Sequence, residues 1–334
     1  MAGPTLIERF GFNAHRLVRD HPPVMESANK RAVYDVACPP VCMHDGEIGY
    51  SRWRLTTLPS HVDAHAAPSL VEARHDMYDY VPVPDLSGAV EWHVNFADPL
   101  LFTAYGSGLF AQDELMVAEH PALASLVEAL HAGAHRAVTE EAGVPTPVLV
   151  TGVERRCVVA TDPDAGAGRS KGLYGRAFAA ANPRQVRQAT RRVEPPTTSN
   201  IIAMAAPRGA GRYSRDQIER IVATAYTGFA AAVAESATMA GTADVPVVIH
   251  TGYWGCGAFG GNRVLMSWLQ VLAAQMAGVT RLVFHTVTAE GAAPLDEALA
   301  AMAKTYTERV AIPSSEALLR VIGRGYEWGT GDGS

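Results

Sequence analysis

The sequence has few cysteines and no long apolar run, and each shortage excludes a class of protein. Its four cysteines, Cys38, Cys42, Cys157 and Cys256, contain one paired spacing, Cys38-Pro-Pro-Val-Cys42. The sequence therefore predicts neither a disulfide framework nor a four-ligand zinc site, and we expect a reducing, cytoplasmic compartment. No apolar run approaches the roughly 18 residues of a transmembrane helix, and the first ten residues do not resemble a signal peptide. We expect no membrane partner.

The sequence also lacks a large excess of charge of either sign. The chain of 334 residues has 28 Lys+Arg against 34 Asp+Glu and a net charge of −6. This balance argues against an extended nucleic-acid-binding surface, which requires an excess of basic residues. Any anionic ligand would have to be held locally, for example by backbone amides. The 48% of hydrophobic residues is enough for a large core.

From position 91 onward, segments typical of strands alternate with segments typical of helices. This order predicts an α/β protein in which a largely parallel sheet lies between helices. We interpret residues 91–334 as a core with a C-terminal helical cover, and residues 1–90 as short helices and loops packed on that core in one single domain. The expected strands are 92–97, 148–153, 157–160, 200–204, 245–250 and 280–287, and the expected helices are 122–141, 214–241 and 262–277.

The most specific segment is the glycine-rich stretch between the last two predicted strands, which precedes the helix that starts at Asn262. It contains five glycines in the ten residues 252–261. Such a loop lets backbone N–H groups surround a phosphate at the start of a helix. A purely structural turn is the alternative. Residues 255–260 also match the dinucleotide pattern G-x-G-x-x-G, but residues 274–281 offer no carboxylate for a ribose, so we reject a dehydrogenase.

A second polar segment follows the strand at 92–97. Asp98 ends that strand, and Gln112-Asp113-Glu114 opens a helix. Two carboxylates and an amide at a helix start can reach a ribose from one side. Adjacent helix positions diverge by about 100°, so Asp113 and Glu114 cannot share one role. Ordinary capping of the helix by acidic residues is the alternative.

Both segments together resemble the poly(ADP-ribose) glycohydrolase family. Residues 251–261 are similar to its phosphate loop, with Tyr253 where the family usually has Asn. Residues 94–98 (VNFAD) resemble its V-D-F-A-N strand, and residues 112–114 (QDE) resemble its Q-E-E signature at the same separation. The strand at 201–204 and the helix segment at 226–229 also look like family counterparts. The resemblance implies a macrodomain-like α/β/α fold that binds ADP-ribose.

The resemblance also implies roles for single residues. Glu114 matches the catalytic glutamate, which protonates the leaving oxygen at the anomeric carbon and then activates water, and Asp113 matches the acid that holds ribose hydroxyls. The implied activity is that of a glycosidase without cofactor or metal. Its partner would be an ADP-ribose-like nucleotide, free or on an ADP-ribosylated macromolecule. The implied ligand-binding residues are Asn95, Asp98, Gln112, Thr251, Gly252, Tyr253, Trp254, Gly255, Cys256, Gly257, Ala258 and Phe259.

Two departures from the family leave alternatives open. The family's triple glycine, a wall of the diphosphate site, corresponds to residues 102–104 (FTA), where we expect side-chain bulk to intrude. The family's tyrosine that closes over the ligand falls near Asp162, so we expect this clasp to be missing. The alternatives are a glycosidase that acts on NAD or a related nucleotide intermediate, and a non-catalytic ADP-ribose-binding module.

Three histidines form a weaker pattern. His61 and His65 have the i, i+4 spacing of two metal ligands, and His75 would be a third. Their Pro, Ser and Ala neighbours predict no helix to hold them. The sequence therefore predicts no metal site.

Overall fold

The computed structural model describes residues 3–40, 42–63, 70–307 and 311–331 and is built on one eight-stranded sheet. Five neighbouring strands of this sheet are parallel to one another, and the remaining three pair antiparallel with their neighbours. In spatial order they are β1 (Thr5–Asn13), β2 (Glu47–Arg54), β8 (Val148–Val159), β9 (Thr190–Ala205), β5 (Val90–Ala97), β10 (Val247–Thr251), β11 (Arg281–His285) and β4 (Val71–Arg74). Two small ribbons add β3 (His61–Val62) with β12 (Ile312–Pro313), and β6 (Glu140–Glu141) with β7 (Val144–Pro145).

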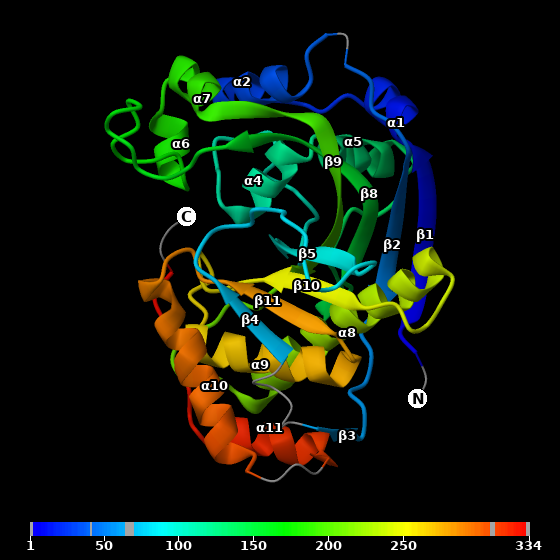
Figure 1. Cartoon of the computed structure of the whole chain (residues 1–334), viewed down its shortest axis with the longest axis vertical. Coiled ribbons are helices and arrows are strands. Elements are labelled where there is room, and N and C mark those ends of the chain that lie inside the picture. The colour runs from blue at the N-terminus through cyan, green and yellow to red at the C-terminus, as the bar shows by residue number, and fades with distance from the viewer. Residues whose placement is uncertain (1–2, 41, 64–69, 308–310, 332–334) are drawn as a thin grey trace.

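Helices cover both faces of this sheet (Figure 1). The helices are α1 (Ala14–Asp20), α2 (Ala28–Ala37), α4 (Gln112–Glu119), α5 (Ala122–Ala132), α6 (Arg176–Ala180), α7 (Pro183–Ala189), α8 (Arg215–Ala240), α9 (Arg263–Ala277), α10 (Ala293–Thr305) and α11 (Ser314–Ile322), with a short 3₁₀ turn at Glu290–Ala292. Successive residues of the central strands point to opposite faces. Leu149 and Ile202 pack under α8 and α9, whereas Val148, Val150 and Ile201 pack under α1 and α5. This three-layer arrangement confirms the predicted α/β fold class.

The two long helices beneath the sheet begin and end where their sequences indicate. The Ser214 side chain accepts a hydrogen bond from the Gln217 backbone N–H at the start of α8, and Gly241 ends the helix in the left-handed conformation. Asn262 caps α9 in the same way, and Gly278 ends it. Because α9 follows the glycine-rich loop directly, its cap fixes where that loop ends.

The interpretation of residues 1–90 as short helices and loops packed on the core is wrong for the described residues. Three strands of the main sheet, β1, β2 and β4, come from this region, together with α1 and α2. The sequence pattern did not indicate β2, because Arg52 within this strand is charged and yet buried. Its guanidinium is paired with Glu8 at 2.7 Å and with Glu141 at 2.9 Å. A fold boundary at residue 90 has no support, since the sheet runs across it.

Smaller differences have local causes. The two strands expected at 148–153 and 157–160 form the single strand β8, which accommodates irregular register opposite β9. The helix expected over 122–141 ends at Ala132, because Gly133 interrupts it. The segment 162–198, to which the sequence analysis assigns no strand or helix, contains α6, α7 and the first half of β9. Among the described residues, no helix combines the length and the apolar character needed to cross a membrane.

Candidate active site

A pocket opens where three neighbouring parallel strands end. β5 lies between β9 and β10, and all three point in the same direction. Their carboxyl ends therefore meet at one edge of the sheet, which is the usual ligand position in open α/β folds. The chain following β5 brings α4 to this edge, and the chain following β10 brings the glycine-rich loop (residues 252–261). The topology thus unites the two segments that the sequence singled out.

The first wall of the pocket is the start of α4. The Gln112 side chain holds this helix end against β5, because its Oε1 accepts from the Phe96 N–H at 2.8 Å and its Nε2 donates to the Val94 carbonyl at 3.0 Å. Gln112 lines the pocket, but both ends of its amide are bound to the strand. Its structural role is therefore to position the two carboxylates that follow it.

Asp113 and Glu114 are both buried and line the pocket. Asp113 Oδ1 accepts from Asn95 Nδ2 at 3.0 Å, and Glu114 Oε2 accepts from the Ala111 backbone N–H at 2.9 Å. Asn95 does not line the pocket and lies behind Asp113. The second of these bonds is the capping interaction that the sequence left as an alternative, so Glu114 caps α4 and faces the pocket at once.

Burial, and next the negative charge of Glu114, raise the pKa of Asp113 to about 8. Asp113 therefore carries a proton at neutral pH. A buried cation, Lys30 of α2, opposes this effect. Burial lowers the pKa of Lys30 to about 8, while Glu114 and Asp113 act in the opposite direction, and its Nζ donates to the Tyr105 carbonyl at 2.8 Å. The sequence offered no signal for Lys30, because one lysine in a helix is normally exposed.

The second wall is the glycine-rich loop, which is held against the end of β9 by a buried hydrogen bond. The buried Trp254 indole donates to the Met204 carbonyl at the end of β9, at 2.9 Å. Gly255 has a φ of +73°, and a Cβ there would lie 2.5 Å from Ala206 Cβ. Both the conformation and the space thus require glycine. The C-terminal segment lies against the far side, where the Gly329 N–H donates to the Gly260 carbonyl at 2.8 Å.

Part of the loop expected to bind ligand lies behind the pocket wall instead. Among the described residues, Thr251, Gly252, Tyr253 and Cys256 do not line the pocket. Thr251 and Gly252 are bound to Gln270 of α9 instead. The Gln270 side chain accepts from the Thr251 hydroxyl at 2.5 Å and donates to the Gly252 carbonyl at 3.0 Å. The Tyr253 hydroxyl donates to the Gly291 carbonyl. Burial raises the pKa of the Cys256 thiol to about 12, which keeps it a neutral packing group.

The pocket brings together most of the remaining predicted residues, and its wall also contains residues that sequence reasoning missed, among them two with long polar side chains. The predicted residues on its wall are Asp98, Gln112, Asp113, Glu114, Trp254, Gly255, Gly257, Ala258 and Phe259. The two residues with long polar side chains are Arg208 and Tyr174. The Arg208 guanidinium lies 4.1 Å from the centre of the Phe259 ring and 3.5 Å from Asp98 Oδ2. Its position directly after a strand that ends at the pocket was the signal that could have found it.

The two expected departures from the family concern residues 102–104 and the tyrosine clasp near Asp162. Phe102 has a φ of +52°, a conformation that glycine adopts without strain, but its ring is buried in the core and does not line the pocket. Bulk at residues 102–104 therefore does not intrude. A tyrosine does reach the pocket from the segment after Asp162, since Tyr174 lies on its wall.

The histidine pattern of the sequence has no support as a metal site. His65 lies outside the described residues. His61 is exposed and contacts the Ser60 hydroxyl at 3.2 Å, and His75 contacts the Thr286 hydroxyl at 3.0 Å. The two described histidines thus have separate partners.

A comparison with known protein families covers the second wall of the pocket, the glycine-rich loop. Residues 167–293 match the sequence model of the family described as "Poly (ADP-ribose) glycohydrolase (PARG), Macro domain fold". No curated protein matches the chain. The glycine-rich loop lies within the matched residues, whereas the carboxylate pair lies before them.

Solved structures of similar proteins are distant. The poly(ADP-ribose) glycohydrolase of Thermomonospora curvata bound to the inhibitor ADP-HPD is 16% identical, with a TM-score of 0.44, and the match covers 86% of this chain and 97% of that one. The Deinococcus radiodurans enzyme in complex with ADP-ribose is 13% identical, with a TM-score of 0.38, over 88% of this chain and 94% of that one. The family assignment rests on the sequence model, which confirms the resemblance. Over residues 167–293 the chain is therefore similar to the poly(ADP-ribose) glycohydrolase family, whose macrodomain fold agrees with the three-layer α/β arrangement described above.

Proposed function

We propose that this protein is an ADP-ribosyl glycohydrolase, which hydrolyses the glycosidic bond at the anomeric carbon of the distal ribose in an ADP-ribose-containing substrate. One observation carries the proposal. Two adjacent buried carboxyl groups, Asp113 and Glu114, face a glycine-rich loop at the start of a helix across a single pocket. This places an acid–base pair beside a site suited to a diphosphate.

Glu114 is the catalytic residue in this proposal. Burial raises the pKa of Asp113 to about 8, so this pair of adjacent carboxyl groups holds one proton at neutral pH. Glu114 donates this proton to the leaving oxygen or nitrogen as its bond to the anomeric carbon breaks. The resulting carboxylate then takes a proton from the water that attacks that carbon. Asp113, fixed by Asn95, holds ribose hydroxyls.

The diphosphate would lie along residues 254–259. The start of α9 adds its partial positive charge there, and Arg208, which also lines the pocket, contributes a full one. Arg208 already rests on the Phe259 ring, so its position is fixed without a ligand. Tyr174 also lines the pocket. The anion is thus held by one cation as well as by backbone amides.

The expected substrate class depends on the space that residues 102–104 leave in the pocket. Because Phe102 is turned into the core, nothing at residues 102–104 narrows the pocket toward small substrates alone. We therefore place ADP-ribose attached to a macromolecule ahead of NAD or a nucleotide intermediate. Mass spectrometry of the products from an ADP-ribosylated peptide, the polymer and NAD separates these cases, since each releases a different partner of ADP-ribose.

The variant Glu114→Gln tests the catalytic role. We expect a loss of about 10²–10⁴-fold in turnover, the usual contribution of general acid–base catalysis, with calorimetric binding of ADP-ribose retained. Glu219→Gln, on the exposed face of α8, is the matched control and should keep full turnover. Full activity of Glu114→Gln on a substrate that the wild type cleaves would refute the assignment. Binding of ADP-ribose by the wild type without turnover of any substrate would favour the non-catalytic module.

A further inference from the structure

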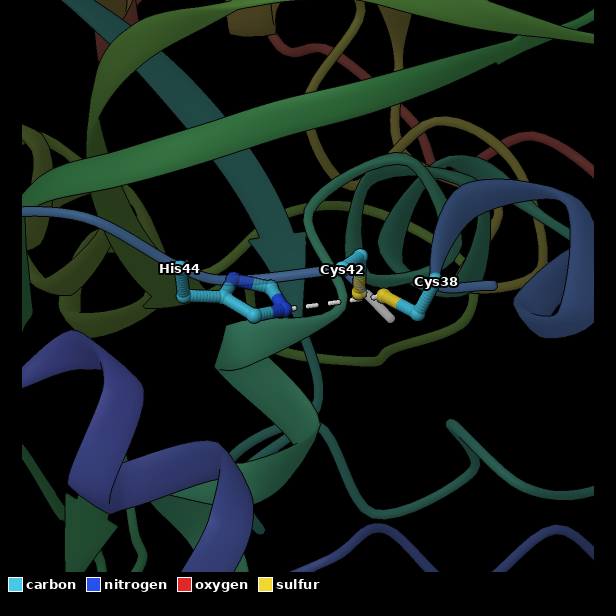
Figure 2. Close-up of side chains that lie close together, drawn as sticks. All are labelled: Cys38, Cys42 and His44. Atoms are coloured by element: carbon cyan, nitrogen blue, oxygen red, sulfur yellow. Dashed lines mark hydrogen bonds between the residues drawn. The ribbon is translucent and has the colours of Figure 1, made fainter. Parts of the chain in front are cut away.

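A cluster of three metal-ligating side chains lies away from the pocket, at the end of α2. Cys38 caps the helix, the Cys42 N–H donates to the Pro39 carbonyl at 2.8 Å, and His44 precedes β2. Figure 2 shows the two thiols side by side, with the His44 ring pointing toward them. The two sulfur atoms and a ring nitrogen all lie within 4.8 Å of one another. The His44 ring is buried and the cysteines are half-buried.

The spacing of these atoms fits a tetrahedral metal. Zinc binds sulfur at about 2.3 Å and imidazole nitrogen at about 2.05 Å, which at the tetrahedral angle separates the two ligand atoms by about 3.6 Å. The distance from Cys38 Sγ to His44 Nε2 is 3.6 Å. This pair therefore needs no rearrangement to share a cation.

The surroundings orient the ligands as they are oriented in metal sites. Two residues of β8 do this, Glu154 and Arg156. Glu154 Oε2 lies 3.1 Å from His44 Nδ1, while Nε2 of the same ring lies 3.6 Å from Cys38 Sγ. A carboxylate behind a ligating histidine is the common second layer of zinc sites. Arg156 donates to the carbonyls of Ala37 at 3.4 Å and Met43 at 3.0 Å, which fixes the backbone on both sides of the ligands.

We propose that Cys38 Sγ, Cys42 Sγ and His44 Nε2 bind one zinc ion, with a fourth position left to water. Two thiolates and a neutral imidazole are a ligand set that favours zinc over harder cations. Binding releases the two thiol protons to solvent, and two thiolates with Zn²⁺ give a neutral cluster in a half-buried place. Because none of its ligands lines the pocket, the ion would support the local fold and take no part in the proposed hydrolysis. It would pin the end of α2, the helix whose Lys30 is coupled electrostatically to the carboxylate pair.

The sequence pattern alone does not reveal this site, because the spacing Cys38-x₃-Cys42 stands alone. The third ligand follows only two residues later, but its orientation depends on Glu154, more than a hundred positions away. A disulfide between the two cysteines, or a thiol that donates a hydrogen bond to His44, would also bring these side chains together. Metal analysis separates the zinc site from both of these arrangements, since only the zinc site takes up a cation.

Metal analysis of the full-length protein tests the proposal. The protein is purified with a reductant, loaded with Zn²⁺ and freed of excess metal, and zinc is counted by mass spectrometry. We expect about one equivalent per chain for the wild type. Cys42→Ser and His44→Gln should lose most of it. Matched controls are Cys256→Ala and His61→Ala, which remove a cysteine and a histidine elsewhere and should retain one equivalent.

Two further measurements protect the test against variants that fail to fold. In the wild type, Co²⁺ should give the intense d–d and thiolate charge-transfer bands of a tetrahedral thiolate site, which zinc then abolishes. Glu154→Gln keeps all three ligands and should weaken zinc binding by about 10–100-fold. The proposal fails if the reduced wild type takes up no zinc, if zinc persists in both ligand variants, or if Cys38 and Cys42 prove to be joined by a disulfide under reducing purification.

Discussion

Asp113→Asn should change how the stability of this protein depends on pH. The pKa of this carboxyl rises from 3.8 in the unfolded chain to about 8 in the folded protein, chiefly because it is buried. Between these values the folded state holds a proton that the unfolded state has released. The free energy of unfolding of the wild type therefore falls as pH rises from about 4 to about 8, and this contribution is complete only below pH 4.

The magnitude follows from the linkage relation. One proton corresponds to a slope of about 1.36 kcal/mol per pH unit, so the upper limit between pH 5 and pH 7 is about 2.7 kcal/mol. Asparagine has no proton to lose. Relative to the wild type, Asp113→Asn should gain stability with rising pH, by up to that amount. Lys30 does not confuse the result, because its pKa is lowered from 10.5 to about 8, and its contribution rises with pH only above that window.

Urea denaturation of both proteins at pH 5, 6 and 7 measures the difference. Asn95→Ser is the control: it removes the hydrogen bond that lowers the pKa of Asp113 but keeps the carboxyl, so the wild-type trend should persist. Glu114→Gln removes the charge that raises the pKa of Asp113, and the trend should weaken. A difference between wild type and Asp113→Asn that stays constant with pH would refute the reasoning.

Two other variants test the walls of the pocket. Lys30→Met removes the cation that lowers the pKa of Asp113, so this pKa should rise further and the basic limb of the pH–rate profile should move to higher pH; a profile unchanged in position would contradict the coupling. Gly255→Ala forces a left-handed conformation and a clash with Ala206, and we expect a loss of about 1–3 kcal/mol in urea denaturation and of ADP-ribose binding in calorimetry. Gly278→Ala has the same backbone strain, with a φ of +72°, but open space around the new Cβ, so its cost should stay near 1 kcal/mol and binding should be unchanged. Equal losses in both glycine variants would show that the close approach to Ala206 does not matter.

The sequence predicted those parts of the fold that depend on local signals. The caps Ser214 and Gly241 delimit α8, and the apolar stretches of β5 and β10 are buried strands as expected. The strands at and near the sheet edges were not predicted, because their patterns of polar and apolar residues depend on partners distant in the chain. Arg52 looks like a surface residue until Glu8 and Glu141 neutralise it. β4, with four residues that are only partly buried or exposed, has no pattern of its own.

The candidate site divides in the same way. Residue types at fixed spacing marked the carboxylate pair and the loop, and the chain does bring Glu114 and residues 254–259 together. Sequence spacing could not separate the loop residues that face the pocket from those that hold it, because that depends on Gln270 of α9. It also could not find Lys30, whose relation to Asp113 exists only after α2 has packed on α4.

The order of the strands has a practical consequence for dissecting this protein. Both edges of the main sheet come from the first ninety residues, β1 at one edge and β4 at the other. A fragment that begins at residue 91 would expose β8 and β11 as new edges. Their residues are largely buried, and unpaired apolar edges recruit strands from other molecules. We therefore propose that the chain folds as one unit, and we expect such a fragment to aggregate when expressed, whereas the full-length chain stays dispersed in size-exclusion chromatography.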